Sequence, residues 1–454
     1  MKVIEARFSR LGSVLLTLAL VVAACGGGDT VSSETTTTTA ESSATTESPT
    51  TTEATEVTAA PMTLSLQHCH SEAQALGPPF AAALAEFKAA HPNITVDETI
   101  TGCDEQEEVA ETSFLANEEA DIIVINPTRQ ALTWVEAGTT IAVDQYLDEW
   151  GVRELLLDVA LQEPSWFTAD GELRGFPYSG FVWPVWYDMD VLGQAGIEEA
   201  PSTVDELIAA SETLAAQGQP AWVVGGLDWS GFNVLFQILQ VYMSDEEMHA
   251  VTASGDYSGS EAVRKGVELF VRLRDAGVFH EDTAGLDVNQ MNSYFFDHQA
   301  AMMHAGSWAF PESPPEQADS IFLSGIPFAE DSIRDRPIAM AGFNGVGFMI
   351  TRNGAENLGA VQEFVTFMYQ PEIVGLFVEM GAMVPAAAEA EFDAGALHPV
   401  FVQSLEELEG RVEFVPPSVI PEGKYDPLQR ATALAYVPGT TVDEILQAMD
   451  EAYQ

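Results

Sequence analysis

Apolar residues recur in strand-like and helix-like patterns along most of the chain. Residues 62–66 alternate between apolar and polar side chains like a strand, residues 80–90 have the apolar spacing of a helix, and residues 94–100 alternate again. This order predicts a strand–helix–strand unit. Its two strands are expected to be parallel neighbours whose carboxyl ends lie together.

Further strand and helix segments follow in the same alternation. Residues 121–126 form a short apolar run typical of a buried parallel strand, and residues 129–137, ended by Gly138, have helical spacing. The other predicted elements are helices at 203–217, 260–276, 355–369 and 441–453 and strands at 221–224 and 345–350. Ser202 or Thr203 is expected to cap the helix at 203–217. The alternation predicts an α/β protein with mostly parallel sheets and helices on both faces.

The amino terminus has the pattern of a secretory signal. Basic residues precede an apolar run at 11–24, which is too short to span a bilayer as a permanent helix, and small residues lead to Cys25. A cysteine in this place resembles a bacterial lipobox. We therefore expect residues 1–24 to be removed and Cys25 to carry lipid, since two or more acyl chains hold a protein on a membrane. The other interpretation is an ordinary secretion signal with an incidental cysteine.

Residues 25–60 continue from that cysteine as a predicted linker. Residues 29–60 consist almost entirely of Thr, Ser, Glu and Ala and include no aromatic residue, a composition that cannot bury enough apolar surface to fold. As a flexible coil this linker would reach roughly 30–35 Å. It would separate a folded body from the membrane while keeping it close.

Residues 61–454 form a segment longer than those normally built around a single hydrophobic core, so two domains or lobes are expected. The chain has 70 acidic residues against 17 Lys and Arg, a formal net charge of −53 at pH 7. Such a charge argues against electrostatic binding of nucleic acid or of anionic lipid headgroups. This composition fits a secreted protein from a saline habitat, and it equally fits an acidic secreted protein from a low-salt organism.

Two of the three cysteines are left after Cys25 is assigned to lipidation. Cys69 and Cys103 both lie just past the ends of the predicted neighbouring strands, and an oxidising compartment favours their pairing as a disulfide. A metal site built from them with His68 and His70 is the competing interpretation. In an extended segment the two histidines point one way and Cys69 the other, so no metal ion and no cofactor are expected. The histidines are expected at a cleft edge, either contacting a polar ligand or solvated.

Several blocks spread over residues 61–454 carry a resemblance to one protein family. They lie at 87–96, 121–126, 136–138, 170–178, 186–192, 195–197, 201–207, 300–308, where the block ends in Gly-x-Trp, and 381–386. In order and spacing they resemble the family 1 extracellular solute-binding proteins of bacterial ABC importers, of which maltose-binding protein is the familiar member. A lipobox and a linker are what such a receptor needs in a cell with one membrane.

The resemblance implies two α/β lobes that close over a ligand. One lobe would comprise residues 61–177 and 326–380 and the other residues 178–325 and 381–454. The cleft would lie at the carboxyl ends of the strands. The protein is expected to be a monomer that is lipid-anchored on the outer face of the cell membrane and delivers its small-molecule ligand to an ABC permease.

A carbohydrate, from a monosaccharide to an oligosaccharide, is the expected ligand. Sugar rings need flat apolar surfaces, and their hydroxyls need short polar partners. The resemblance implies Trp308 and Tyr425 as stacking aromatics and Arg129 as a sugar-contacting residue. Maltose itself is not expected, because Thr128 and Phe181 replace an aspartate and a glutamate of the maltose binder. The other candidate ligand-binding residues are His68, His70, Phe181, Trp183, Asp228, Trp229, Phe343 and Asn344, any of whose aromatic rings could instead belong to the core.

Two other functions remain open. A glycosidase would need two carboxylates about 5–10 Å apart, and no spacing singles out such a pair. The sequence also lacks a Gly-x-Ser-x-Gly elbow, a His-Glu-x-x-His helix and a phosphate loop, so no catalytic residues are expected. A binding protein for a non-sugar solute, either a polyamine or ferric ion, is the main alternative.

Overall fold

The computed structural model describes residues 60–454. The predicted signal peptide at 1–24, the lipidation site Cys25 and the predicted linker up to residue 59 lie outside the described residues. Within residues 60–454, no helix is both long and apolar enough to cross a membrane.

A five-stranded sheet forms the first lobe, with strand order β2-β1-β3-β11-β4. Its strands are β1 (Met62–His68), β2 (Ile94–Ile100), β3 (Ile122–Ile125), β4 (Phe176–Pro177) and β11 (Gly347–Ile350). The helices of this lobe are α2 (Gly77–Ala90), α3 (Gln106–Ala116), α4 (Asp144–Glu149), α11 (Arg352–Glu356), α12 (Leu358–Met368) and α13 (Pro371–Gly381). The predicted strand–helix–strand unit is confirmed, because β1 and β2 pair in parallel along their whole length and α2 connects them.

A four-stranded sheet with order β7-β8-β6-β9 forms the second lobe. Its strands are β6 (Val185–Asp188), β7 (Trp222–Val223), β8 (Met302–His304) and β9 (Ile321–Ser324). Its helices are α5 (Met189–Gln194), α6 (Val204–Ala215), α7 (Trp229–Leu239), α8 (Asp245–Ser254), α9 (Glu261–Asp275), α10 (Val288–Phe296), α14 (Pro399–Glu406), α15 (Leu408–Arg411), α16 (Tyr425–Ala433) and α17 (Val442–Glu451).

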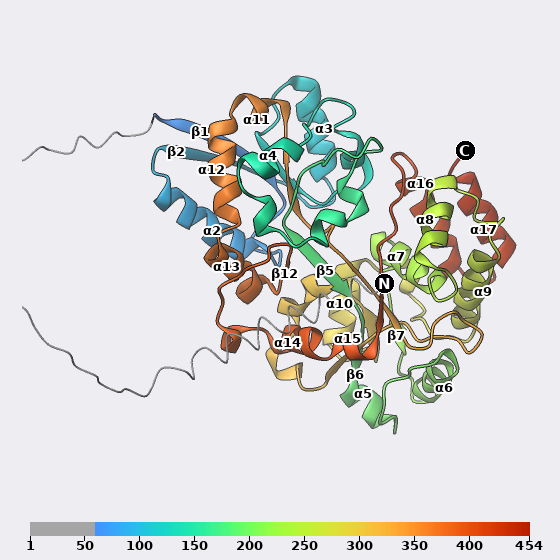
Figure 1. Ribbon diagram of the computed structural model, residues 1–454. Helices are drawn as coiled ribbons and strands as arrows, with labels where there is room; N and C mark the ends of the chain where they lie inside the picture. Colours follow the sequence, from blue (N-terminus) through green and yellow to red (C-terminus); the bar gives the residue numbers. More distant parts are fainter. Residues whose placement is uncertain (1–59) are drawn as a thin grey trace, which may run out of the picture.

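A third sheet connects the two lobes. It contains β12 (Val384–Pro385), β5 (Ser179–Trp183), β10 (Ile338–Gly342) and β13 (Glu413–Val415), in that order. Strand β5 runs from the first lobe toward the second (Figure 1). Several separate segments of the chain therefore cross between the lobes in this sheet.

The expected fold class, a two-lobed α/β protein, is confirmed, but the expectation of mostly parallel sheets is wrong. Of the ten strand pairings among the described residues, four are parallel and six are antiparallel. The helical connection of β1 to β2 gives a parallel pair. Strands such as β11 return from the other lobe instead, and they enter their sheets in the opposite direction.

Two helix predictions also need correction. Residues 129–137 do not form an α-helix: a 3₁₀ helix covers Arg129–Thr133, and Arg129 itself has φ of 45°. The segment predicted at 355–369 is divided at Asn357 into α11 and α12. The cap of α6 is as expected, since the Thr203 hydroxyl accepts from the Glu206 amide at 3.3 Å and the Glu206 carboxylate accepts from the Thr203 amide at 3.0 Å.

Buried apolar side chains form two clusters that meet at the second sheet. The first fills the first lobe and continues to one face of the second sheet through Trp186, Met303 and Leu323. The second cluster covers the opposite face of that sheet and includes Ile326 and Ile338. Residues 326–338, expected in the first lobe, therefore pack with the second.

Candidate functional site

A cavity of about 370 Å³ lies between the two lobes and the connecting sheet. This is within the usual range for small-molecule sites, roughly 300–1,000 Å³. The structure places eight of the predicted binding residues in its lining: His70, Arg129, Phe181, Trp183, Trp229, Trp308, Asn344 and Tyr425. These side chains come from seven separate segments of the chain, so the fold assembles them in one place.

Three tryptophans form one wall of the cavity. The ring centroid of Trp308 lies 4.9 Å from that of Trp183 and 5.6 Å from that of Trp229, and the remaining pair is 5.5 Å apart. All three pairs are edge-to-face, a favourable arrangement for aromatic rings. Phe181 extends the wall, with its ring 6.0 Å from that of Trp308. Trp183 is nearly buried, whereas the other three rings are partly exposed to the cavity.

Gly306 explains why the Gly-x-Trp block has a glycine at this position. A Cβ atom there would lie 2.1 Å from the indole ring of Trp308. Trp308 could not move aside freely, because its ring is packed against Trp183 and Trp229. The absence of a side chain at Gly306 thus sets the orientation of the Trp308 ring.

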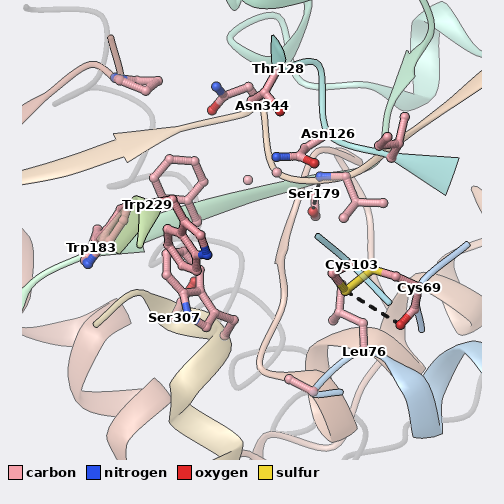
Figure 2. A pocket seen from close by; sticks show the side chains of 18 of the residues that line it. Cys69, Leu76, Cys103, Asn126, Thr128, Ser179, Trp183, Trp229, Ser307 and Asn344 are labelled. Carbon is pink, nitrogen blue, oxygen red and sulfur yellow. Dashed lines mark hydrogen bonds between the residues drawn. A yellow bond between two sulfur atoms is a disulfide. The ribbon is translucent and has the colours of Figure 1, made fainter. Parts of the chain in front are cut away.

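Uncharged polar groups form the opposite wall. Figure 2 shows Asn126, Ser179 and Asn344 across the cavity from the indoles of Trp183 and Trp229. The Oδ1 atom of Asn344 is buried without a hydrogen-bond partner, as is the Oγ atom of Ser418 elsewhere in the lining. An unpartnered buried polar atom costs about 1–3 kcal/mol, so a ligand that supplies hydrogen bonds here would relieve that cost.

Arg129 connects the two lobes at the edge of the cavity. Its guanidinium lies 4.9 Å from the ring centroid of Tyr425, at the start of α16 in the second lobe. The Nε atom of Arg129 also lies 3.8 Å from an Asp426 carboxylate oxygen. Burial raises the pKa of Tyr425 to about 12, with the positive charge of Arg129 acting in the opposite direction. Tyr425 therefore stays neutral and presents an aromatic face.

Glu107 is the buried carboxylate of the lining. Burial raises its pKa from 4.5 to about 7, although the charge of Arg129 and hydrogen bonds from the Gln130 backbone and the Thr128 side chain lower it. Its Oε2 atom has no hydrogen-bond partner. Near neutral pH this group therefore changes protonation state and can either accept or donate a hydrogen bond.

The disulfide between Cys69 and Cys103 is present, with Cα atoms 4.9 Å apart, and both residues line the cavity. The His68 and His70 rings lie on one side and stack with centroids 5.8 Å apart, as the extended segment predicted. Burial lowers the pKa of His70 to about 3, so this ring is neutral at the cavity wall.

Three predicted binding residues do not line the cavity. His68 is buried behind it, with its ring packed against Phe80 at 4.5 Å. Asp228 caps α7, because its carboxylate accepts from the amides of Ser230 and Val288 at 2.8 Å each. The ring of Phe343 belongs to the first core cluster.

Much of the polar lining is not marked as ligand-binding by the sequence. The uncharged or acidic lining residues that were not among the predicted binding residues are Gln74, Asp104, Gln106, Glu107, Asn126, Thr128, Ser179, Asn233, Ser307 and Ser418. Most lie in loops or at helix ends, where no hydrophobic periodicity marks them. Only the position of a residue in the chain could have indicated these side chains. Asn126 and Thr128, for example, directly follow β3 at the carboxyl edge of the first sheet, where ligands bind in such folds.

Two α/β lobes with a cavity between them define a two-lobed binding protein. The chain belongs to the bacterial extracellular solute-binding proteins, whose family model matches residues 71–374. The resemblance drawn from the sequence blocks is thereby confirmed.

Solved structures show the same fold. A protein described as a probable secreted solute-binding lipoprotein from Streptomyces coelicolor has 33% identity and a TM-score of 0.74, and the match covers 86% of this chain and 98% of that chain. A chitin oligosaccharide binding protein has 19% identity and a TM-score of 0.73, with coverage of 86% and 98%. A maltose-bound protein of T. maritima has 17% identity and a TM-score of 0.67, also with coverage of 86% and 98%.

The curated relatives match over a shorter stretch. A binding protein of Brucella abortus (strain 2308) is 29% identical over 143 residues, which is 31% of this chain. The match spans only a third, 33%, of that relative's length.

Proposed function

We propose that this protein captures a carbohydrate between its lobes and delivers it to the permease of an ABC importer. The lobes would comprise the expected segments, with residues 326–338 moved to the second lobe because of their packing. Closure of the lobes would enclose the sugar. Lipid on Cys25 would hold the protein on the outer face of the cell membrane, with residues up to 60 as the linker.

The opposed walls of the cavity are the observation that carries this proposal. Sugars present apolar C–H faces and a rim of hydroxyls, and the cavity offers tryptophan rings facing amide and hydroxyl groups. The unpartnered atoms of Asn344, Ser418 and Glu107 suit hydroxyls, which both donate and accept hydrogen bonds. Relatives with the same fold that bind maltose and chitin oligosaccharides support the same ligand class.

The charges in the lining weigh against the two non-sugar ligands. A polyamine needs several carboxylates, but the lining has Asp104, Glu107 with its raised pKa, and the opposing cation Arg129. Ferric ion favours a cluster of tyrosines and carboxylates. Among the lining residues that the structure describes, Tyr425 is the only tyrosine, and it stacks on Arg129.

The same residues weigh against a glycosidase. Two catalytic carboxylates must flank the scissile bond from different sides. Asp104 and Glu107 both come from one short segment of the first lobe, at the start of α3. The relatives found are binding proteins, which also favours binding without turnover.

A thermal-shift screen of residues 60–454 against sugars, polyamines and ferric salts tests the proposal. A sugar at 100 times its dissociation constant should stabilise the folded state by about 2.7 kcal/mol. The bound sugar should be recovered unchanged after incubation. A shift with polyamines or iron but with no sugar would contradict the proposal, as would the release of new reducing ends.

A further inference from the structure

The Cys69–Cys103 disulfide lies on the surface of the ligand cavity. Both cysteines line it, and Figure 2 shows the sulfur–sulfur bond on the side of the cavity away from the indoles of Trp183 and Trp229. Cys103 is exposed and Cys69 is half-buried. The bond therefore occupies a place that a ligand or solvent can reach, unlike a disulfide inside a core.

The disulfide joins two separate segments of the lining. The pairing of β1 with β2 ends at His68 and Ile100, and the Thr101 amide then donates to the His68 carbonyl at 3.0 Å. Beyond this point the disulfide connects the chain that follows β1 with the chain that follows β2. The strand pair is thereby extended, by a covalent bond, up to the cavity.

Each joined segment carries groups that face the ligand space. The segment after β1 contributes His70, Gln74 and Leu76, and the segment after β2 contributes Asp104, Gln106 and Glu107. Leu76 also meets the end of α13, because a Cβ atom on Gly381 would lie 2.8 Å from its Cδ2 atom. The first segment is thus in contact with the chain that leads from α13 into the connecting sheet.

We propose that the Cys69–Cys103 disulfide positions these two segments for the ligand, so that reducing it weakens ligand binding in a protein that is still folded. The inference rests on the proposed function only in requiring that the cavity bind a solute. A purely structural disulfide would act through the unfolded chain and would leave the affinity of the folded, reduced protein unchanged. By linkage, if reduction raises the dissociation constant of the ligand by a given factor, saturating ligand must lower the equilibrium constant for reduction by the same factor.

The first test measures sugar affinity in serine variants of the full chain. The parent carries Cys25→Ser, which leaves Cys69 and Cys103 as its only cysteines. The variant adds Cys69→Ser and Cys103→Ser. At a temperature where both are folded by circular dichroism, calorimetric titration with the sugar found in the screen should give a dissociation constant at least tenfold higher for the variant.

A matched control separates a local effect on the cavity from general loosening of the strand pair. Ile94 pairs with Met62 at the opposite end of β1 and β2 and is 4% exposed. Ile94→Val in the Cys25→Ser parent should lower the melting temperature and leave the dissociation constant unchanged. Equal affinity of the serine variant and the parent would overturn the inference. Absence of sugar binding by the parent would instead overturn the proposed function.

The second test uses the disulfide itself and does not depend on the serine variant being folded. A small dithiol reductant passes two electrons and two protons to the two sulfur atoms and becomes a cyclic disulfide. In the Cys25→Ser parent, saturating sugar should lower the equilibrium constant for this reduction at least tenfold, which corresponds to about 30 mV. The same constant with and without sugar would overturn the inference.

Discussion

Replacing Trp308 by alanine separates a ligand platform from a core residue. The Trp308 ring is partly exposed to the cavity and contacts Trp183, Trp229 and Phe181. If a sugar ring stacks on it, Trp308→Ala removes a contact that exists only in the complex. Buried aromatic anchors of this kind contribute about 2–4 kcal/mol, so the dissociation constant should rise roughly 30- to 700-fold.

Removing the ring also has a cost to folding. Each aromatic pair adds about 0.5–1.5 kcal/mol beyond its buried area, so the three pairs of Trp308 suggest a loss of about 1.5–4.5 kcal/mol. Because the ring is partly exposed, we expect a loss in the lower part of this range. A fully buried aromatic would cost about 3–5 kcal/mol when truncated to alanine. The variant should fold, melt a few degrees below wild type without ligand, and lose the ligand-induced rise in melting temperature.

Trp222→Phe is the matched control for this variant. Trp222 is fully buried outside the cavity lining, and its Nε1 atom has no hydrogen-bond partner to lose. This change should lower the melting temperature and leave the dissociation constant unchanged. Calorimetric titration and thermal melting of the three proteins give both quantities. If Trp308→Ala binds sugar as tightly as wild type, or loses stability like a core variant while still binding, the assignment of Trp308 to the site is wrong.

Two further changes test the carboxylate of the cavity and the membrane anchor. Because the pKa of Glu107 is raised from 4.5 to about 7, the native state holds this proton more tightly than the unfolded chain, and stability should fall as pH rises from about 4.5 to about 7. In urea unfolding at several pH values, Glu107→Gln should remove on the order of 3 kcal/mol of that fall in the free energy of unfolding. A pH dependence of stability identical to that of wild type would contradict the raised pKa of Glu107. Cys25→Ser should release the folded protein into the medium, and equal partition of wild type and variant into a detergent phase would refute lipidation.

Local patterns were sufficient for much of the first lobe. The alternation at β1 and β2 and the helical spacing of α2 come from residues close in sequence, so period and topology together placed Cys69 beside Cys103. The Gly-x-Trp block was likewise informative, because the glycine and the ring that lies against it are only two positions apart.

Non-local arrangements could not be predicted in this way. The antiparallel pairing of β11 with β3 joins segments more than 200 residues apart in sequence, and no local pattern carries its direction. The sequence suggests Asp228 as a ligand contact, yet an aspartate before a helix also serves as its cap, and that role holds here. Glu107 and Ser418 resemble ordinary surface residues in the sequence and become site candidates only because the fold encloses them.

A crystal structure of the protein with the sugar that gives the largest thermal shift would show whether the cavity between the lobes binds a carbohydrate. We expect the sugar in this cavity, with the apolar face of a ring against Trp308 or Trp229. We also expect hydrogen bonds from the sugar hydroxyls to Asn344 and Ser418, whose side-chain oxygens now lack partners. A sugar bound elsewhere on the molecule, with this cavity empty, would refute the proposed function.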